Sequence, residues 1–170
     1  HTHYPLSSLA GKEADRIITC VAPTKTFNIA GVQAAVMIAT DAQKRDRLKD
    51  HALAHGQMEL SPFGATALQA AYEHGGPWLD ELLEVLSSNI NYAIETISYA
   101  LPKVKISQPH ATYLLWIDYR LTGLTEEKIM ELLIQKGKLA LEPGSKYGES
   151  GRGFLRMNIA CPRKTLEEGV

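Results

Sequence analysis

Two apolar runs near the start of the chain predict a pair of buried strands. We expect the first strand at residues 15–21 and the second at residues 32–40. Neither run alternates cleanly between apolar and polar side chains, which is typical of strands covered on both faces. A short polar segment that contains Lys25 separates the two runs.

The pattern then changes to the three- and four-residue steps of helices. We predict helices at residues 41–55, 60–73 and 78–101, and the last of these is the longest regular element. Its apolar residues form one stripe that we expect to lie in the core: Leu79, Leu82, Leu83, Leu86, Ile90, Ile94, Ile97 and Leu101. A helix of this length spans ~35 Å, which is enough to connect two domains.

After Pro102 short strands alternate with a helix, which predicts a compact α/β unit. We expect strands at residues 104–106, 111–119, 139–141 and 154–160, and a turn-rich loop at residues 144–153. Thr125 is expected to cap the intervening helix. We place a domain boundary at Leu101, so that residues 1–101 and 102–170 belong to two domains.

The composition is that of an ordinary soluble globular protein. The chain has 170 residues, of which 45% are hydrophobic and 22% charged, with a formal net charge of −1. This balance gives no electrostatic reason to expect a nucleic acid or a membrane surface as partner. We see no bilayer-spanning run and no export signal, and we therefore expect a cytoplasmic protein. A disulfide could join Cys20 and Cys161, but we expect both cysteines to be reduced and buried.

The two ends of the sequence suggest a fragment. The chain begins without methionine, and its last residues, 165–170, resemble the first turns of a helix. His1 and His3 could provide half of a metal site, but no third or fourth ligand follows nearby. We predict a loop there and no metal site.

Lys25 is the first candidate for chemistry. A lysine at the end of a buried strand would be desolvated, and desolvation favours the neutral amine. The neutral amine can form a Schiff base with an aldehyde or accept a proton. The alternative is an ordinary solvated surface charge.

Arg156 is the second candidate, because it interrupts the apolar strand predicted at residues 154–160. A buried guanidinium stays charged near neutral pH and needs an anion. The anion could be an internal aspartate or glutamate, or the carboxylate of a ligand, which the planar guanidinium can bind through two hydrogen bonds. The sequence leaves both alternatives open.

The segments around these two residues resemble one enzyme family. Residues 22–31 resemble the lysine segment of fold-type-I enzymes that use pyridoxal 5′-phosphate (PLP), and are most similar to the MalY/PatB type of cystathionine β-lyase. Within residues 142–158, Pro143-Gly144 followed by Arg156 resembles the loop and strand arginine with which fold-type-I PLP enzymes hold the substrate's α-carboxylate. The junction at residues 75–82 and residues 136–138 are similar to the MalY/PatB type. The resemblance covers essentially the whole chain. It implies an α/β aspartate aminotransferase-like fold, comprising the C-terminal part of the large domain and a truncated small domain.

The resemblance also implies roles for individual residues. Lys25 would carry PLP and move the substrate's Cα proton, and Thr24 would contact the cofactor phosphate. Arg156 would bind the substrate carboxylate, with Tyr113 close to the substrate. Many relatives have a phosphate-binding arginine eight residues after the lysine. Gln33 stands there in this chain, so that contact is not carried over.

The implied activity is a β-elimination that releases thiol, pyruvate and ammonia from cystathionine or a cysteine S-conjugate. An aminotransferase of the same fold is the first alternative, because it needs the same lysine and arginine. A regulatory protein that uses the fold to bind a partner, as a MalY-type protein does, is the second. The family also implies a homodimer that acts on a small amino acid. From the charge balance, the hydropathy and the lack of further metal ligands near the histidines, we expect no nucleic acid, membrane or metal to be involved.

Overall fold

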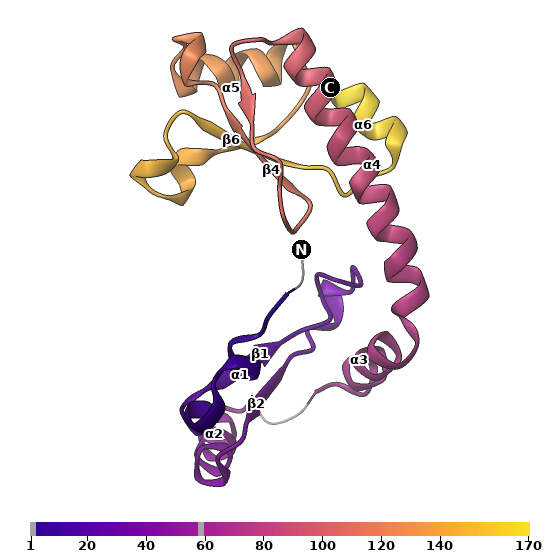
Figure 1. Ribbon diagram of the computed structural model, residues 1–170, viewed down its shortest axis with the longest axis vertical. Coiled ribbons are helices and arrows are strands. Elements are labelled where there is room, and N and C mark those ends of the chain that lie inside the picture. Colours follow the sequence, from indigo (N-terminus) through magenta and orange to yellow (C-terminus); the bar gives the residue numbers. More distant parts are fainter. Residues whose placement is uncertain (1–2, 58–59) are drawn as a thin grey trace. The chain divides into compact units, whose positions relative to one another are not determined.

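A computed structural model describes residues 3–57 and 60–170, and it divides into two compact units (Figure 1). The first unit ends at Glu81 and the second spans Leu82–Val170. Helix α4, Gly76–Ala100, begins in the first unit and continues in the second. The domain boundary that we predict at Leu101 stays a prediction.

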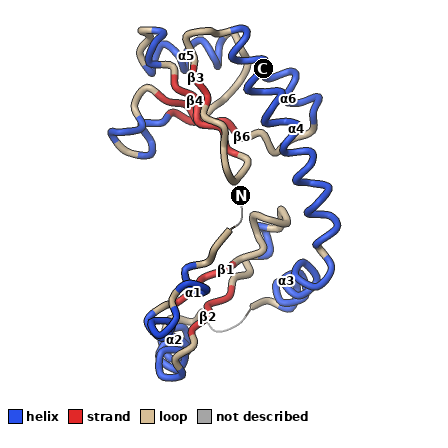
Figure 2. Tube along the Cα trace, viewed as in Figure 1, coloured by secondary structure: helices blue, strands red, loops and turns tan. Residues whose placement is uncertain are grey.

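The first unit is built on a two-stranded antiparallel sheet, drawn in red in Figure 2. Strand β1, Ile18–Val21, pairs with β2, Val36–Ala39, so that Val21 lies opposite Val36. The other elements are α1 (Leu6–Leu9), η1 (Gly11–Arg16), η2 (Ala30–Val32), α2 (Ala42–Ala54) and α3 (Pro62–His74).

The helices of this unit begin where the sequence places their caps. The Asp41 carboxylate accepts a hydrogen bond of 2.7 Å from the Lys44 amide at the start of α2. The Ser61 hydroxyl accepts one of 3.0 Å from the Gly64 amide at the start of α3. Each cap satisfies a backbone donor that has no partner within its helix. The predicted helices at residues 41–55 and 60–73 are confirmed to within two residues at each end.

The prediction that both strands are buried is wrong for this structure. Ile18 is 44% exposed, and Met37 and Ile38 are 53% and 51% exposed. The free thiol of Cys20 is exposed as well. The apolar pattern predicts a covered sheet, but within the described residues the sheet has only two strands. Their faces therefore remain open.

The second unit contains a four-stranded antiparallel sheet in the order β3-β4-β6-β5. Its strands are β3 (Lys105–Ile106), β4 (Leu114–Asp118), β5 (Glu142–Pro143) and β6 (Phe154–Asn158). Its other elements are η3 (Arg120–Thr122), α5 (Glu126–Gln135), η4 (Gly144–Tyr147), η5 (Glu149–Gly151) and α6 (Arg163–Gly169). Thr125 caps α5 as predicted. The strand predicted at residues 139–141 is wrong, because the chain joins the sheet only at Glu142.

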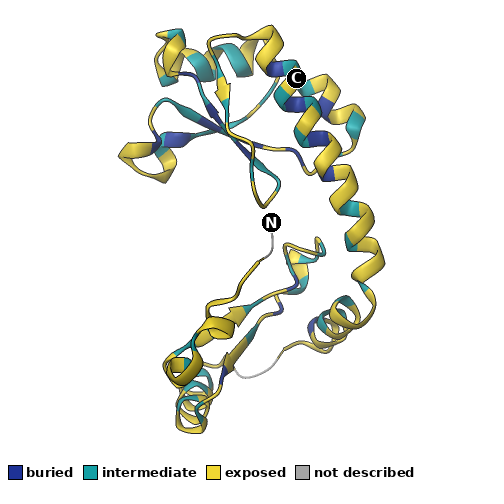
Figure 3. Cartoon of the chain, in the orientation of Figure 1, coloured by how far each residue is buried: buried dark blue, intermediate teal, exposed yellow. Residues whose placement is uncertain are grey.

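One face of this sheet carries the hydrophobic core (Figure 3). Leu115 and Ile117 of β4 and Leu155 and Met157 of β6 are buried there, and helices α4, α5 and α6 pack over them. From the predicted stripe of α4, Leu86 and Ile97 are buried, whereas Leu83 and Leu101 are exposed. The stripe is therefore only partly core.

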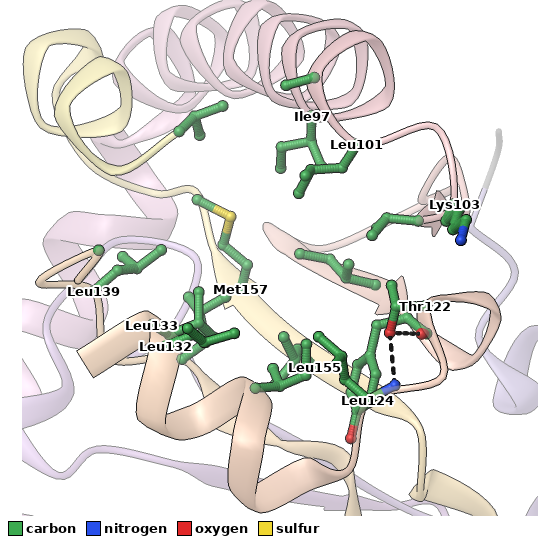
Figure 4. Close-up of a pocket in the computed structure, with 18 of the residues that line it drawn as sticks. Ile97, Leu101, Lys103, Thr122, Leu124, Leu132, Leu133, Leu139, Leu155 and Met157 are labelled. Atoms are coloured by element: carbon green, nitrogen blue, oxygen red, sulfur yellow. Dashed lines mark hydrogen bonds between the residues drawn. The ribbon is translucent and has the colours of Figure 1, made fainter. Parts of the chain in front are cut away.

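An apolar hollow of about 730 Å³ lies on the same face (Figure 4). Its walls include Ile97 of α4, Leu101 just after this helix, Leu133 of α5, and Leu155 and Met157 of β6. Side chains alternate between the two faces of a strand. Arg156, between Leu155 and Met157, therefore belongs to the opposite face of the sheet from this hollow.

Candidate functional site

Each unit contributes one candidate segment, and the first follows strand β1. Here the chain turns back on itself between Pro23 and Ile29. The Phe27 amide donates a hydrogen bond of 2.9 Å to the Pro23 carbonyl, and the Ile29 amide donates one of 3.0 Å to the Thr24 carbonyl. Pro23 is fully buried and anchors this turn. Lys25 lies within the turn, and these two backbone hydrogen bonds hold its main chain in place.

The side chain of Lys25 is exposed. Within the described residues, nothing buries Lys25 as the sequence predicts, because the two-stranded sheet beside it is not covered on its faces. Within residues 3–57 and 60–170, no carboxylate pairs with the Lys25 ammonium. The amine is thus presented without an internal counter-ion, in a segment that also carries the Thr24 and Thr26 hydroxyls.

An aromatic cluster fixes the far side of this turn. The Phe27 ring lies 6.2 Å from the ring of Tyr72 on α3 and 6.1 Å from that of Trp78 on α4. Gly75, between the two helices, is where a Cβ atom would stand 2.4 Å from the Phe27 ring. The glycine at this helix junction therefore allows the Phe27 ring to pack here. The packed ring helps to hold the turn at residues 23–29, which we call the lysine turn.

Gln33 follows this segment in a left-handed backbone conformation with φ of 51°. Non-glycine residues adopt this conformation rarely. The Gln33 side chain is exposed.

The side chain of Thr24, next to Lys25, is half-buried. Its role as a contact of the cofactor phosphate stays a prediction.

The second candidate segment surrounds Arg156 on the face of the sheet opposite the core. Arg156 lies in β6, directly opposite Trp116 of β4 on one side and Glu142 of β5 on the other. Its side chain is 32% exposed. We call Trp116, Glu142, Lys146, Tyr147 and Arg156 the Arg156 cluster.

Glu142 is the centre of charge pairing in this cluster. Its carboxylate accepts from the guanidinium of Arg156 and from the Tyr147 hydroxyl, and it pairs with the Lys146 ammonium at 2.7 Å. The hydrogen bonds from Lys146 and Tyr147, with the charge of Arg156 nearby, lower the pKa of Glu142 to about 2. The hydrogen bond that the Tyr147 hydroxyl donates to Glu142 raises the pKa of this hydroxyl.

Aromatic rings hold the guanidinium in place from the side. The Arg156 guanidinium carbon lies 5.0 Å from the centre of the Tyr147 ring, a distance at which a cation is attracted to the ring face. Tyr147 meets Trp116 edge to face at 5.9 Å, and Trp116 stacks on Phe154 at 5.4 Å. The orientation of Arg156 is therefore set by its neighbours before any ligand arrives.

The structure answers part of the question that the sequence leaves open at Arg156. An internal carboxylate, that of Glu142, does pair with it. The pair is partly exposed, so it does not exclude a ligand carboxylate. Tyr113 is half-buried at the edge of the core, where its carbonyl accepts a hydrogen bond of 3.0 Å from the Ile159 amide. Its role beside the substrate stays a prediction.

Three glycines of the loop before β6 allow this loop to pack closely. A Cβ atom at Gly144 would stand 2.1 Å from the Gly151 carbonyl oxygen, and one at Gly151 would stand 2.0 Å from that of Gly144. Gly153 makes the same kind of close contact with the Arg120 side chain. These three glycines are needed for the loop to pack on its own protein.

Sequence reasoning gave no role to Glu142, Lys146, Tyr147 or Trp116. Glu142, Lys146 and Tyr147 lie within a segment that carries the resemblance, and Trp116 lies within a predicted strand, but the meeting of the four side chains depends on strand register. The available signal was the acidic residue just before Pro143, on the strand that turns out to pair with β6. A pairing of β5 with β6 would have placed that carboxylate opposite Arg156.

Two further expectations concern metals and membranes. No group of three or more histidine, cysteine, aspartate or glutamate side chains suited to a metal ion occurs in the part of the chain that the structure describes. His1 of the predicted histidine pair lies outside the described residues. No helix in residues 3–57 and 60–170 is both long and apolar enough to cross a bilayer.

Comparison with curated proteins places the chain among known sequences. It is 45% identical over 170 residues to cystathionine beta-lyase PatB of Bacillus subtilis, covering 100% of this chain and 44% of that protein. It is 37% identical over 148 residues to protein MalY of Escherichia coli, covering 86% of this chain and 38% of that protein. The chain thus spans less than half the length of both relatives, and it matches their C-terminal part. No family profile matches the chain.

Comparison with solved structures agrees. Cystalysin from Treponema denticola, which contains a pyridoxal 5′-phosphate cofactor, superposes with a TM-score of 0.93 at 30% identity. The match covers 99% of this chain and 43% of cystalysin. The fold is therefore that of the C-terminal part of an aminotransferase-like, PLP-dependent protein, as the sequence predicts. The chain belongs to the MalY/PatB-type family of aminotransferase-like proteins.

Proposed function

We propose that the protein to which this chain belongs is a PLP-dependent carbon–sulfur β-lyase acting on cystathionine or related cysteine S-conjugates. The observation that carries this proposal is the 45% identity to a cystathionine beta-lyase along all 170 residues, with the lysine turn and the Arg156 cluster both inside the match. Because the chain spans 44% of that relative, the activity of the whole protein is our inference.

The residues on the lysine turn fit PLP. The cofactor has an aldehyde and a phosphate, and the turn offers an exposed primary amine beside two hydroxyl groups, with no carboxylate of the described residues on the amine. Lys25 would hold the cofactor through its amine and Thr24 would contact the phosphate. When bound, PLP supplies an electron sink that stabilises negative charge at the Cα atom of an amino acid.

The remaining steps use this chain's own side chains. Arg156 would bind the α-carboxylate of the substrate, since a partly exposed guanidinium held by Tyr147 can offer two parallel N–H donors to a carboxylate. Lys25, as the free amine, would take the proton from Cα. The bond between Cβ and sulfur then breaks, with its electron pair leaving on the thiolate. Hydrolysis of the remaining three-carbon unit gives pyruvate and ammonia. Tyr113 would lie close to the substrate.

The first experiment tests the lysine. The full-length protein is incubated with PLP and reduced with borohydride, and its peptides are analysed by mass spectrometry beside those of Lys25→Ala. We expect the reduced cofactor on Lys25 in the wild type and no adduct in the variant. An adduct on another lysine, or none in the wild type, would contradict the assignment of Lys25.

The second experiment separates lyase from aminotransferase. The wild type is given cystathionine, and pyruvate and thiol are measured. In parallel, amino transfer to a 2-oxo acid is measured with the same preparation. We expect pyruvate and thiol in equal amounts, without any need for a 2-oxo acid. Turnover that requires the 2-oxo acid would identify an aminotransferase, and bound PLP without either activity would favour a MalY-like regulatory protein.

We further propose a cytoplasmic homodimer whose ligand is a small amino acid and which needs no nucleic acid or membrane. Sedimentation analysis of the full-length protein tests the dimer. A monomer at micromolar concentration would contradict it.

A further inference from the structure

We propose that Glu142 is a resident counter-ion of Arg156, and that a ligand carboxylate binds Arg156 only by displacing it. Glu142 would then be a specificity-determining residue that sets how tightly the site binds carboxylates. The inference rests on the proposed function in one respect, namely that Arg156 receives the substrate carboxylate.

The position of Glu142 is built into the sheet. β5 contains only Glu142 and Pro143, and its register places Glu142 directly opposite Arg156. The two side chains form an ion pair on the face of the sheet away from the core. A ligand that approaches Arg156 from solvent therefore finds the guanidinium already paired with a carboxylate.

Glu142 does not leave by protonation near neutral pH. The groups that face it are Arg156 from β6 and Lys146 and Tyr147 from η4, and all three stabilise its charged form. Together they hold the pKa of this carboxyl at about 2. The ligand carboxylate therefore competes with the charged Glu142 carboxylate for Arg156. Protonation of Glu142 does not free the guanidinium near neutral pH.

The cluster provides somewhere for Glu142 to remain after displacement. One carboxylate oxygen, Oε1, pairs with Lys146 at 2.7 Å, while Oε2 accepts from Tyr147 and Arg156. If a ligand takes the guanidinium, Glu142 keeps Lys146 and Tyr147. The charges of Arg156, Lys146 and Glu142 give the cluster a net charge of +1. One ligand carboxylate therefore neutralises the cluster, and a second would be repelled. This arrangement favours ligands that present a single carboxylate at this position.

Partial exposure makes the exchange feasible. The Arg156 side chain is 32% exposed, that of Glu142 36% and that of Lys146 60%. Ion pairs at this exposure are weak and are easily exchanged. Tyr147 meanwhile keeps the guanidinium oriented through their ring contact. The exchange therefore requires movement of Glu142 alone.

Calorimetric titration of the full-length, PLP-loaded protein with 3-(methylthio)propanoate tests the proposal. This probe has the carboxylate and sulfur of an S-methyl cysteine but no amino group, so it cannot react with the cofactor. We expect Glu142→Gln to bind it about fivefold more tightly than the wild type, because the competing charge is gone. Glu149→Gln is the matched control, since Glu149 lies in the same loop but pairs with Arg152. It should bind the probe as the wild type does.

A second variant gives the opposite sign. Lys146→Met removes the group that retains displaced Glu142, so it should weaken probe binding. In the double variant with Glu142→Gln, the loss of Lys146 should cost less than it does in the wild type. This non-additivity measures the link between the two residues. A defect of folding alone would weaken binding in both single variants and would not produce tightening.

The outcomes test separately whether Glu142 is displaced and whether Arg156 binds the carboxylate. If Arg156→Gln abolishes probe binding but Glu142→Gln does not tighten it, the displacement proposal is wrong and the role of Arg156 survives. If Arg156→Gln leaves binding unchanged, the assignment of Arg156 in the proposed function is wrong. Should Glu142→Gln fail to fold, Glu142→Asp replaces it. Its shorter side chain reaches Arg156 less well, and unchanged or weaker binding would again overturn the proposal.

Discussion

At the scale of single residues, Arg156 combines a structural position with an accessible charge. Its backbone continues strand β6, whose other side, at Leu155 and Met157, faces the core. Its guanidinium lies against Tyr147 and pairs with Glu142, yet a third of the side chain stays exposed. A permanently charged group is thus held in one orientation without being sealed from solvent, which is what recognition of an anion requires.

The stability provided by Glu142 should depend on pH. Its pKa is about 2 in the folded protein, below the ordinary value of 4.5. A carboxylate with a lowered pKa stabilises the fold fully above its unfolded pKa, and this contribution is lost as the pH falls through the folded value. Glu142→Gln should therefore melt below the wild type at pH 7, and the difference should shrink between about pH 4.5 and pH 2.

Thermal melts at several pH values measure this difference. Glu149→Gln provides the comparison, because the Glu149 side chain is 82% exposed in its pair with Arg152. That variant should differ little from the wild type throughout. A melting difference for Glu142→Gln that stays constant down to pH 2 would contradict the charge pairing described for the cluster.

Asn89 is a buried polar residue with a structural role. It is 1% exposed, and its amide donates hydrogen bonds of 3.0 Å and 2.9 Å to the carbonyls of Ile159 and Cys161. These bonds tie α4 to the chain that leaves β6. Asn89→Ala would strand two carbonyls and leave a small cavity, and should destabilise the protein by about 2–3 kcal/mol. Urea denaturation measures the change, with exposed Asn91→Ala on the same helix expected to have little effect.

At the scale of elements, the helices were predicted better than the strands. Local signals such as Asp41, Ser61 and Thr125 fix where α2, α3 and α5 begin, because a cap acts within a few residues. Strand pairing joins residues far apart in sequence. The apolar residues 139–141 looked like a strand, but the ladder forms at Glu142, and nothing in a three-residue pattern reveals its register.

The loop between β5 and β6 depends on two glycines in contact. Gly144 and Gly151 are both buried, and a Cβ atom on Gly151 would stand 2.0 Å from the Gly144 carbonyl oxygen. Gly151→Ala should therefore force η4 and η5 apart and destabilise the second unit by about 1–3 kcal/mol. The exposed neighbour Ser150→Ala, in the same short helix, is the control. Equal urea midpoints for the two variants would show that the loop can relax around the added methyl group.

At the scale of the whole molecule, the sequence identified the candidate functional residues more readily than the side chains that contact them or their exposure. Lys25 and Arg156 stand out because each is a charge beside apolar strand residues, in a segment typical of one family. The partner of Arg156 could not be read in this way, because Glu142 reaches it only through the order of the sheet. The sequence also left open whether Lys25 is desolvated or exposed, since an apolar pattern does not say which surfaces cover it.

The two units differ in how much core each contains among the described residues, and this difference predicts their local stability. Leu115 and Leu155 are buried within a ten-residue cluster, whereas Cys20 and Met37 lie on an open two-stranded sheet. Two-stranded sheets are marginally stable in water, and amides exchange according to local opening. In the 170-residue chain, we expect the amides of β4 and β6 to exchange about 100-fold more slowly than those of β1 and β2. Hydrogen–deuterium exchange with mass spectrometry resolves these segments. Equal protection would mean that the first unit is stabilised by contacts beyond those of its open sheet.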